Sequence, residues 1–139
     1  MPGTFRIFPD HGLVYVRYDG HILHDDTVAL MSRYNQDPLA RPGYKQLVDL
    51  SRVTSFEQDF PRLMRIQAEK LDIILRGVPQ TLMVYLAPTK MSQDMARFVV
   101  RSWNGLSGLV ISVQTTEEQA LSILGLPEPS IEALFSGVE

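Results

Sequence analysis

The chain has 139 residues, no cysteine and a formal net charge of −3 at pH 7. This length fits one globular domain, and the lack of cysteine excludes disulfides, thiolate catalysis and cysteine-ligated metals. The slight acidic balance gives no basic excess for binding nucleic acid. Apolar runs reach only about five residues, against about twenty for a membrane-spanning helix. We therefore expect a cytoplasmic chain without a leader or a transmembrane segment.

Local patterns predict elements in the order β-β-α-β-α-β-α-β-α. Strands are expected where apolar residues alternate or run on continuously, and helices where they recur at helical spacing. The expected strands are residues 5–8, 13–18, 45–50, 80–86 and 109–113. The expected helices are residues 27–36, 60–76, 92–104 and 115–124.

Capping residues mark where three of these helices should begin. Asp59 is a good N-cap, and Pro61 in the first turn strengthens the signal. Ser92 is the expected cap of the next helix. Thr115 with Glu118 has the spacing of a capping box for the last one.

Helices that alternate with apolar strands imply right-handed crossovers and a mainly parallel sheet. The first two strands, joined by a short turn, should form an antiparallel hairpin. We therefore expect an α/β fold, a two-layer sheet of about five strands, with residues 1–126 as a single domain. The tail, residues 127–139, carries Ile131, Leu134 and Phe135 at a spacing that allows a short docked helix.

Two segments carry a resemblance to a known family. Residues 47–54 read Leu-Val-Asp-Leu-Ser-Arg-Val-Thr, and residues 84–88 read Val-Tyr-Leu-Ala-Pro. With the element order, which covers about residues 5–124, they resemble the SpoIIAA-like branch of the STAS superfamily. That branch is structurally related to the Sec14-like lipid-binding fold. The resemblance implies this fold and a role in binding other proteins.

The phosphorylation switch of the STAS anti-sigma-factor antagonists is not carried over. Those relatives follow the strand with Asp-Ser-Ser-Gly, whose serine a partner kinase phosphorylates. Counted without gaps, that element falls on residues 57–60, which read Glu-Gln-Asp-Phe. Gln58 occupies the acceptor position and has no hydroxyl, so the resemblance implies the fold without the switch.

The carboxyl ends of the strands are where open parallel sheets usually carry function. We call this edge the rim and expect it at residues 51–59, 87–92 and 114–115. Its candidate residues for a partner or ligand are Asp49, Ser51, Thr54, Ser55, Gln58, Asp59, Thr89 and Lys90. Most of them also suit ordinary capping and loop roles. Phosphorylation of Ser51, Thr54 or Ser55 beside a helix N-terminus is a further hypothesis.

The three histidines are His11, His21 and His24, and several aspartates lie nearby in the sequence. A His-x-x-His pair beside two carboxylates is one pattern that binds zinc. If the residues between them are extended, however, His21 and His24 point to opposite faces. We therefore expect no metal and no cofactor.

The sequence is compatible with three functions. The first is a non-enzymatic interaction or regulatory module that binds a protein partner or forms a homodimer. The second is a binder of a small apolar ligand or lipid, which needs a cavity of roughly 300 Å³ or more between the sheet and the middle helices. The third, an enzyme, ranks last, because the only titratable residues offered at the rim are Asp49, Glu57, Asp59 and Lys90.

Overall fold

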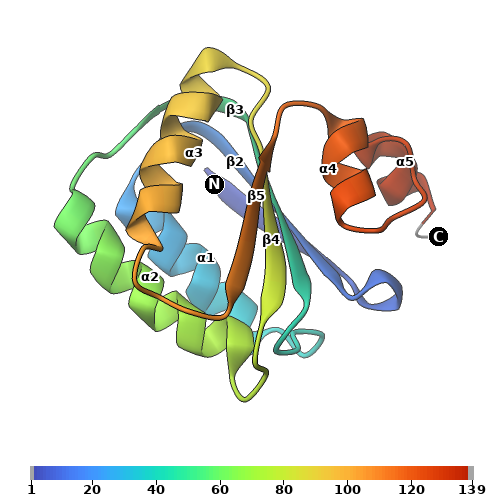
Figure 1. Ribbon diagram of the computed structural model, residues 1–139, viewed down its shortest axis with the longest axis horizontal. Coiled ribbons are helices and arrows are strands. Elements are labelled where there is room, and N and C mark those ends of the chain that lie inside the picture. Colours follow the sequence, from blue (N-terminus) through green and yellow to red (C-terminus); the bar gives the residue numbers. More distant parts are fainter. Residues whose placement is uncertain (1, 138–139) are drawn as a thin grey trace.

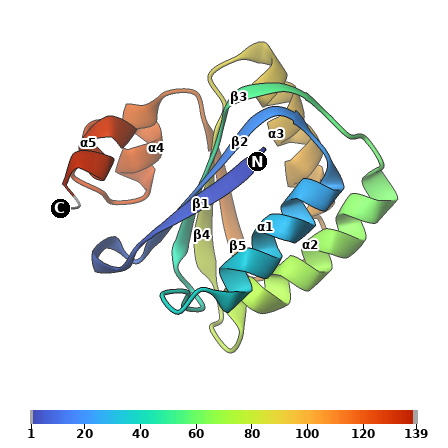
Figure 2. The ribbon, with the colours of Figure 1, turned by 180° about the vertical axis from the view of Figure 1, so that it is seen from behind.

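A computed structural model of the chain describes residues 2–137 and contains one five-stranded sheet. Its spatial order follows the chain, and β1 is antiparallel to β2 while all other neighbours are parallel. The strands are β1 (Gly3–Phe8), β2 (Leu13–Ile22), β3 (Lys45–Phe56), β4 (Thr81–Leu86) and β5 (Leu109–Gln114). Strands β1 and β5 are therefore the two edge strands, or borders, of the sheet, and Figure 2 shows the β1 side in front.

Helices cover both faces of the sheet, as Figure 1 shows. Connections between parallel strands are right-handed. Each of the three here leads to the neighbouring strand in the same direction across the sheet, from β2 to β5. The three connecting helices therefore lie on one face. The last two helices lie against the opposite face. The helices are α1 (His24–Gln36), α2 (Phe60–Leu75), α3 (Lys90–Ser102), α4 (Glu117–Ile123) and α5 (Ile131–Ser136).

The expected fold class is confirmed: an α/β fold with a five-stranded sheet, an antiparallel first pair and alternating strands and helices. The α4–α5 pair adds a partial layer on the second face. Within the tail, Leu134 of α5 is fully buried, so this short helix is docked on the sheet. Residues 138 and 139 of the expected tail lie outside the described residues.

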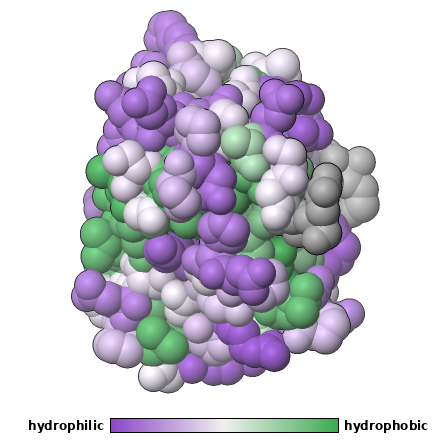
Figure 3. All heavy atoms as spheres, turned by 90° about the vertical axis from the view of Figure 1, so that its right-hand side faces the viewer, coloured by the Kyte–Doolittle hydropathy of each residue, from purple (hydrophilic) through white to green (hydrophobic). Residues whose placement is uncertain are grey.

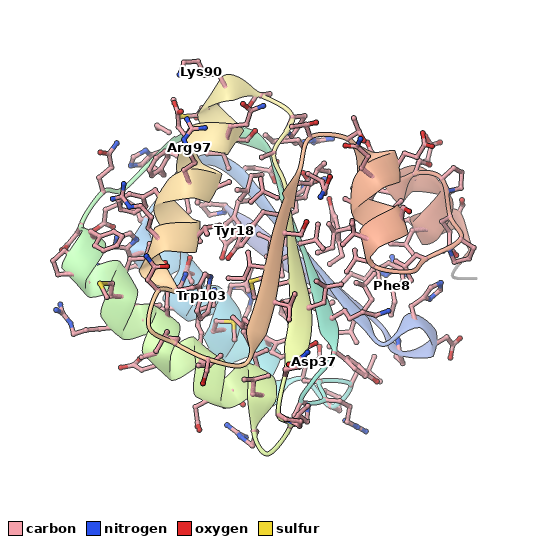
Figure 4. The ribbon with its side chains drawn as sticks, viewed as in Figure 1. Phe8, Tyr18, Asp37, Lys90, Arg97 and Trp103 are labelled. Atoms are coloured by element: carbon pink, nitrogen blue, oxygen red, sulfur yellow. The ribbon has the colours of Figure 1, made fainter. Side chains whose placement is uncertain are left out.

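Alternation along β3 explains how one strand supports two cores. Leu47 points to the α4–α5 side, while Val48 and Leu50 point to the α1–α3 side. Figure 4 shows the result: Tyr18 and Trp103 lie between the sheet and α1–α3, whereas Phe8 lies toward α4 and α5. Both faces of β4 are covered, which accounts for its continuous apolar run.

The expected end of β3 is wrong. Residues 51–56, assigned to the rim, continue the strand, and β2 extends with them to Ile22. Asp19 pairs with Arg52, and His21 pairs with Ser55, after two irregularities in the register. The sequence of this part of β3 resembles a loop because its residues are mostly polar. Arg52 and Thr54 face solvent, while Val53 between them is buried.

Several helix starts also differ from expectation, and the reasons are local. Helix α1 begins at His24, three residues early, because the Asp26 carboxylate accepts a hydrogen bond from the Leu23 amide at 2.8 Å. Helix α3 begins at Lys90, because Thr89 is the cap and Ser92 lies one turn inside. The expected cap Asp59 is confirmed, since it accepts from the Arg62 amide at 3.2 Å.

The cap of helix α4 lies one residue later than expected. Thr116, and not Thr115, caps it by accepting a hydrogen bond from the Gln119 amide at 3.2 Å. The adjacent threonines offer the same cap chemistry, so the sequence alone does not separate them.

The docking of α5 gives a testable prediction about stability. Replacing the fully buried Leu134 by alanine should cost roughly 2–5 kcal/mol of unfolding free energy, because it leaves a cavity in the α4–α5 core. Ile123→Ala on the exposed side of α4 is the matched control and should cost under about 1 kcal/mol. Urea denaturation measures both values, and equal losses would contradict the docking of α5.

Candidate functional site

Asp49 is the most constrained of the residues expected at the rim. It is buried, and its Oδ1 accepts hydrogen bonds from the Ser51 amide at 2.9 Å and the Ser51 hydroxyl at 2.6 Å. The Tyr15 hydroxyl donates to its Oδ2 at 2.5 Å. Burial and the adjacent Asp49 carboxylate raise the pKa of Tyr15. Because three donors meet this carboxylate, its role is to fix the local structure where β2 and β3 run side by side.

The structure does not bring the expected rim residues together as one site. Asp49 and Ser51 face α5 and line an open groove with Arg52 and Glu132. Phe56 and Gln58 lie on another groove, beside α3. The sheet separates the two, because successive residues of β3 point to opposite faces.

The remaining rim residues have separate, local roles. The Ser55 hydroxyl is 2.6 Å from His21 Nδ1, and Thr54 is exposed. Thr89 caps α3, and the Lys90 side chain is 87% exposed, with its Nζ 3.5 Å from Asp94. The rim therefore contains caps and surface residues rather than a converging set of titratable groups.

The histidines are dispersed over the fold. His11 Nε2 lies 3.0 Å from Glu128 Oε2, and His21 contacts Ser55. His24 is buried, and its Nε2 donates to the Asp59 carbonyl at 2.8 Å. Over residues 2–137, no three histidine, aspartate or glutamate side chains come close enough together to hold a metal ion.

An aromatic cluster beside the rim was missed in the sequence. The ring centroids of Phe56 and Phe60 each lie 5.4 Å from that of Phe98, and all three side chains are only half-buried. The Arg101 guanidinium lies 5.2 Å from the Phe60 ring centroid. The three aromatic residues come from β3, α2 and α3, so only the folded chain assembles them.

We call the surface lined by Phe56, Gln58, Asp94, Arg97, Phe98, Val100, Arg101 and Val113 the rim groove. Arg97 forms an ion pair with Asp94, and Figure 4 shows Arg97 and Lys90 projecting outward from α3. Arg101 has no carboxylate within ion-pair distance among residues 2–137. The groove thus combines half-exposed aromatic rings with an excess of positive charge.

A cavity of about 50 Å³ lies between the sheet and α1–α3. Gln67 lines it, and its Nε2 donates to Ser102 Oγ at 3.0 Å. Ser102 in turn donates to the Val99 carbonyl, so the buried Gln67 Oε1 is the atom left without a partner. This volume suits a buried water, which would satisfy that oxygen, and is well below the roughly 300 Å³ of a small-molecule site.

Phe56 and Phe98 line both the cavity and the rim groove, so these two rings form part of the wall between them. Lys70 also lines the cavity, with its Nζ 5.4 Å from the Trp103 ring centroid. Burial lowers the pKa of Lys70 to about 8.

No protein-family model matches this chain, and no curated protein matches it. Within residues 2–137, no helix has the length and apolar character required to cross a membrane.

Lys70 gives a prediction about pH. Its folded-state pKa lies below the unfolded value of 10.5, so unfolding takes up a proton between these two values. Stability should therefore rise from about pH 8 toward pH 10, where the tyrosines begin to ionise in the unfolded chain. Lys70→Met should raise stability at pH 7 by roughly 1–2 kcal/mol and abolish this rise.

Chemical denaturation at a series of pH values measures this dependence. Lys90→Met, at an exposed position, is the control and should keep the rise. A stability that is flat from pH 8 to pH 10 in the unmodified chain would contradict the burial of the Lys70 ammonium group.

Proposed function

We propose that this chain is a non-enzymatic, STAS-like interaction module of the cytoplasm that binds a protein partner through the rim groove. The observation that carries the proposal is the half-exposed cluster of Phe56, Phe60 and Phe98 with Arg101 stacked on it. Aromatic and arginine side chains are enriched at the centres of protein interfaces and contribute most of their binding energy.

The chemistry of the groove suggests what the partner presents. Arg101 has no ion-pair partner among the described residues and lies against an aromatic ring, so it is held in place before binding. Outside the groove lining, Met91 at the start of α3 and Met64 on α2 are also exposed, and methionine adapts to varied apolar surfaces. A segment with an apolar anchor and an adjacent carboxylate would match this arrangement.

Two features support a binding role over catalysis. The rim carboxylates are engaged in local structure: Asp49 accepts three hydrogen bonds, and Asp59 caps α2. The strand order also runs without reversal from β1 to β5, whereas doubly wound sheets bind nucleotides in the crevice created where the order reverses. This sheet has no such crevice among its described strands.

The alternative function, binding of a small apolar ligand or lipid, has less support. The cavity lies where that function requires it, between the sheet and the helices, but its volume of about 50 Å³ is several times too small. Binding a protein partner at the surface does not require a larger cavity, and we therefore favour the interaction module.

The proposed module works without the serine switch of its suggested relatives. Gln58, at the position of the acceptor serine, is exposed and lines the rim groove, so it suits direct contact with a partner. Of the nearby hydroxyl groups, that of Ser51 is hydrogen-bonded to Asp49 and that of Ser55 to His21. Intact-mass measurement of chain isolated from its native cells should show no added phosphate, and a phosphorylated Ser51, Thr54 or Ser55 would contradict a switch-free module.

Affinity capture from lysate of cells that naturally produce the chain tests the binding surface. We expect a specific protein to be retained by the unmodified chain and lost by at least tenfold with Arg101→Glu, because a charge reversal in the groove repels the partner. Arg65→Glu, also exposed but on α2 and outside the groove, is the matched control and should retain it. Equal capture by both variants would exclude the rim groove as the binding surface.

A further inference from the structure

The border strand β5 lacks the usual protection against pairing. It hydrogen-bonds only to β4 among the described strands, so the backbone groups on its outer side face away from the sheet. Residues 106–116 contain no charged residue and no proline. In natural proteins, border strands usually carry charged residues or proline, which prevent pairing with another chain. A border strand without them can pair with a further strand.

Exposed apolar side chains flank this border on both faces of the sheet. Val110 is 49% exposed and points to the α4–α5 face, where Ile123 of α4 is 47% exposed. Val113 is 41% exposed and points to the α3 face, where it shares the rim groove with Val100. In Figure 3, hydrophobic surface lies along the left side, the side toward which β5 borders the sheet.

The opposite border is protected. Strand β1 contains Arg6, whose guanidinium lies 5.5 Å from the Phe8 ring centroid and 5.2 Å from that of Phe135. The Gly3 carbonyl at its start accepts a hydrogen bond from Arg33 at 2.8 Å. The contrast between the two borders indicates that β5 is the one available for pairing.

We propose that β5 pairs antiparallel with β5 of a second copy of the chain, so that two sheets join into one across a two-fold axis. This inference deepens the proposed role as an interaction module by naming one partner and its surface. A two-fold axis perpendicular to the sheet keeps equivalent faces together, and it makes the same strand self-complementary.

The side chains of β5 suit this pairing about Ser112. Each Ile111 then stands opposite Val113 of the second copy on the α3 face, where both are apolar. Ser112 meets its own counterpart on the other face, and Val110 meets Gln114. Although each chain carries a net charge of −3, the absence of charge along the border removes repulsion at the contact itself. An antiparallel pair points the rims of the two copies in opposite directions along the strands, and Val113, which lines the rim groove, lies at the seam.

Light scattering after size-exclusion chromatography tests the pairing. The unmodified chain should show a mass of about twice 15.7 kDa that falls toward one chain on dilution. Val113→Lys and Val110→Lys should each shift it to the single-chain mass, whereas the matched control Val28→Lys, at an equally exposed valine of α1, should not. A strict single-chain mass for the unmodified protein, or a dimer that both β5 variants leave intact, would overturn the proposal.

The absence of native cysteine permits a second, independent test. Ser112→Cys should form a disulfide-linked dimer on mild oxidation, because directly opposed residues of antiparallel strands lie about 4.5–5.5 Å apart between Cα atoms. Ser136→Cys, exposed on α5, should not. Absence of the Ser112 cross-link, or equal cross-linking of both variants, would overturn the proposed register. The two proposals can fail separately. If the chain does not dimerise but Arg101→Glu still abolishes capture of the protein partner, only the dimer is refuted. If the chain dimerises but Arg101→Glu leaves capture unaffected, only the role of the rim groove is refuted.

Discussion

The constraint on which the rest of this structure depends is the direction of its crossovers. Each parallel connection is right-handed and moves to the next strand on the same side, so α1, α2 and α3 fall on one face of the sheet. The other face must then be covered by the C-terminal helices, which place Leu121, Leu124 and Leu134 on it. The same order also makes β5 a border, since no later strand among residues 2–137 pairs with it.

This arrangement explains why the candidate functional features lie on surfaces. The layer of side chains between the sheet and α1–α3 is nearly filled, since the cavity described there has a volume of about 50 Å³. Most buried polar groups form hydrogen bonds within the fold; for example, the Asp49 carboxylate accepts hydrogen bonds from Tyr15 and Ser51. What remains available is the rim groove, with its aromatic cluster and Arg101, and the uncharged border at β5.

Much of the fold followed from the sequence because its signals are local. Asp59 and Pro61 mark the start of α2, and the continuous apolar run of β4 marks a strand covered on both faces. The second half of β3 could not be recognised, because its polar residues resemble a loop and only pairing with β2 makes them a strand. The candidate site was predicted less well: residues 51–56 of the expected rim are strand, and the cluster of Phe56 and Phe98 depends on contacts between distant elements.

The central claim is that the strand order leaves β5 as an open border that a second chain covers. Hydrogen–deuterium exchange of the unmodified protein at high and low concentration measures this directly. Amides of Leu109–Gln114 should exchange more slowly at high concentration, while those of the β1 border should not change. Exchange of β5 that is fast and independent of concentration would contradict it.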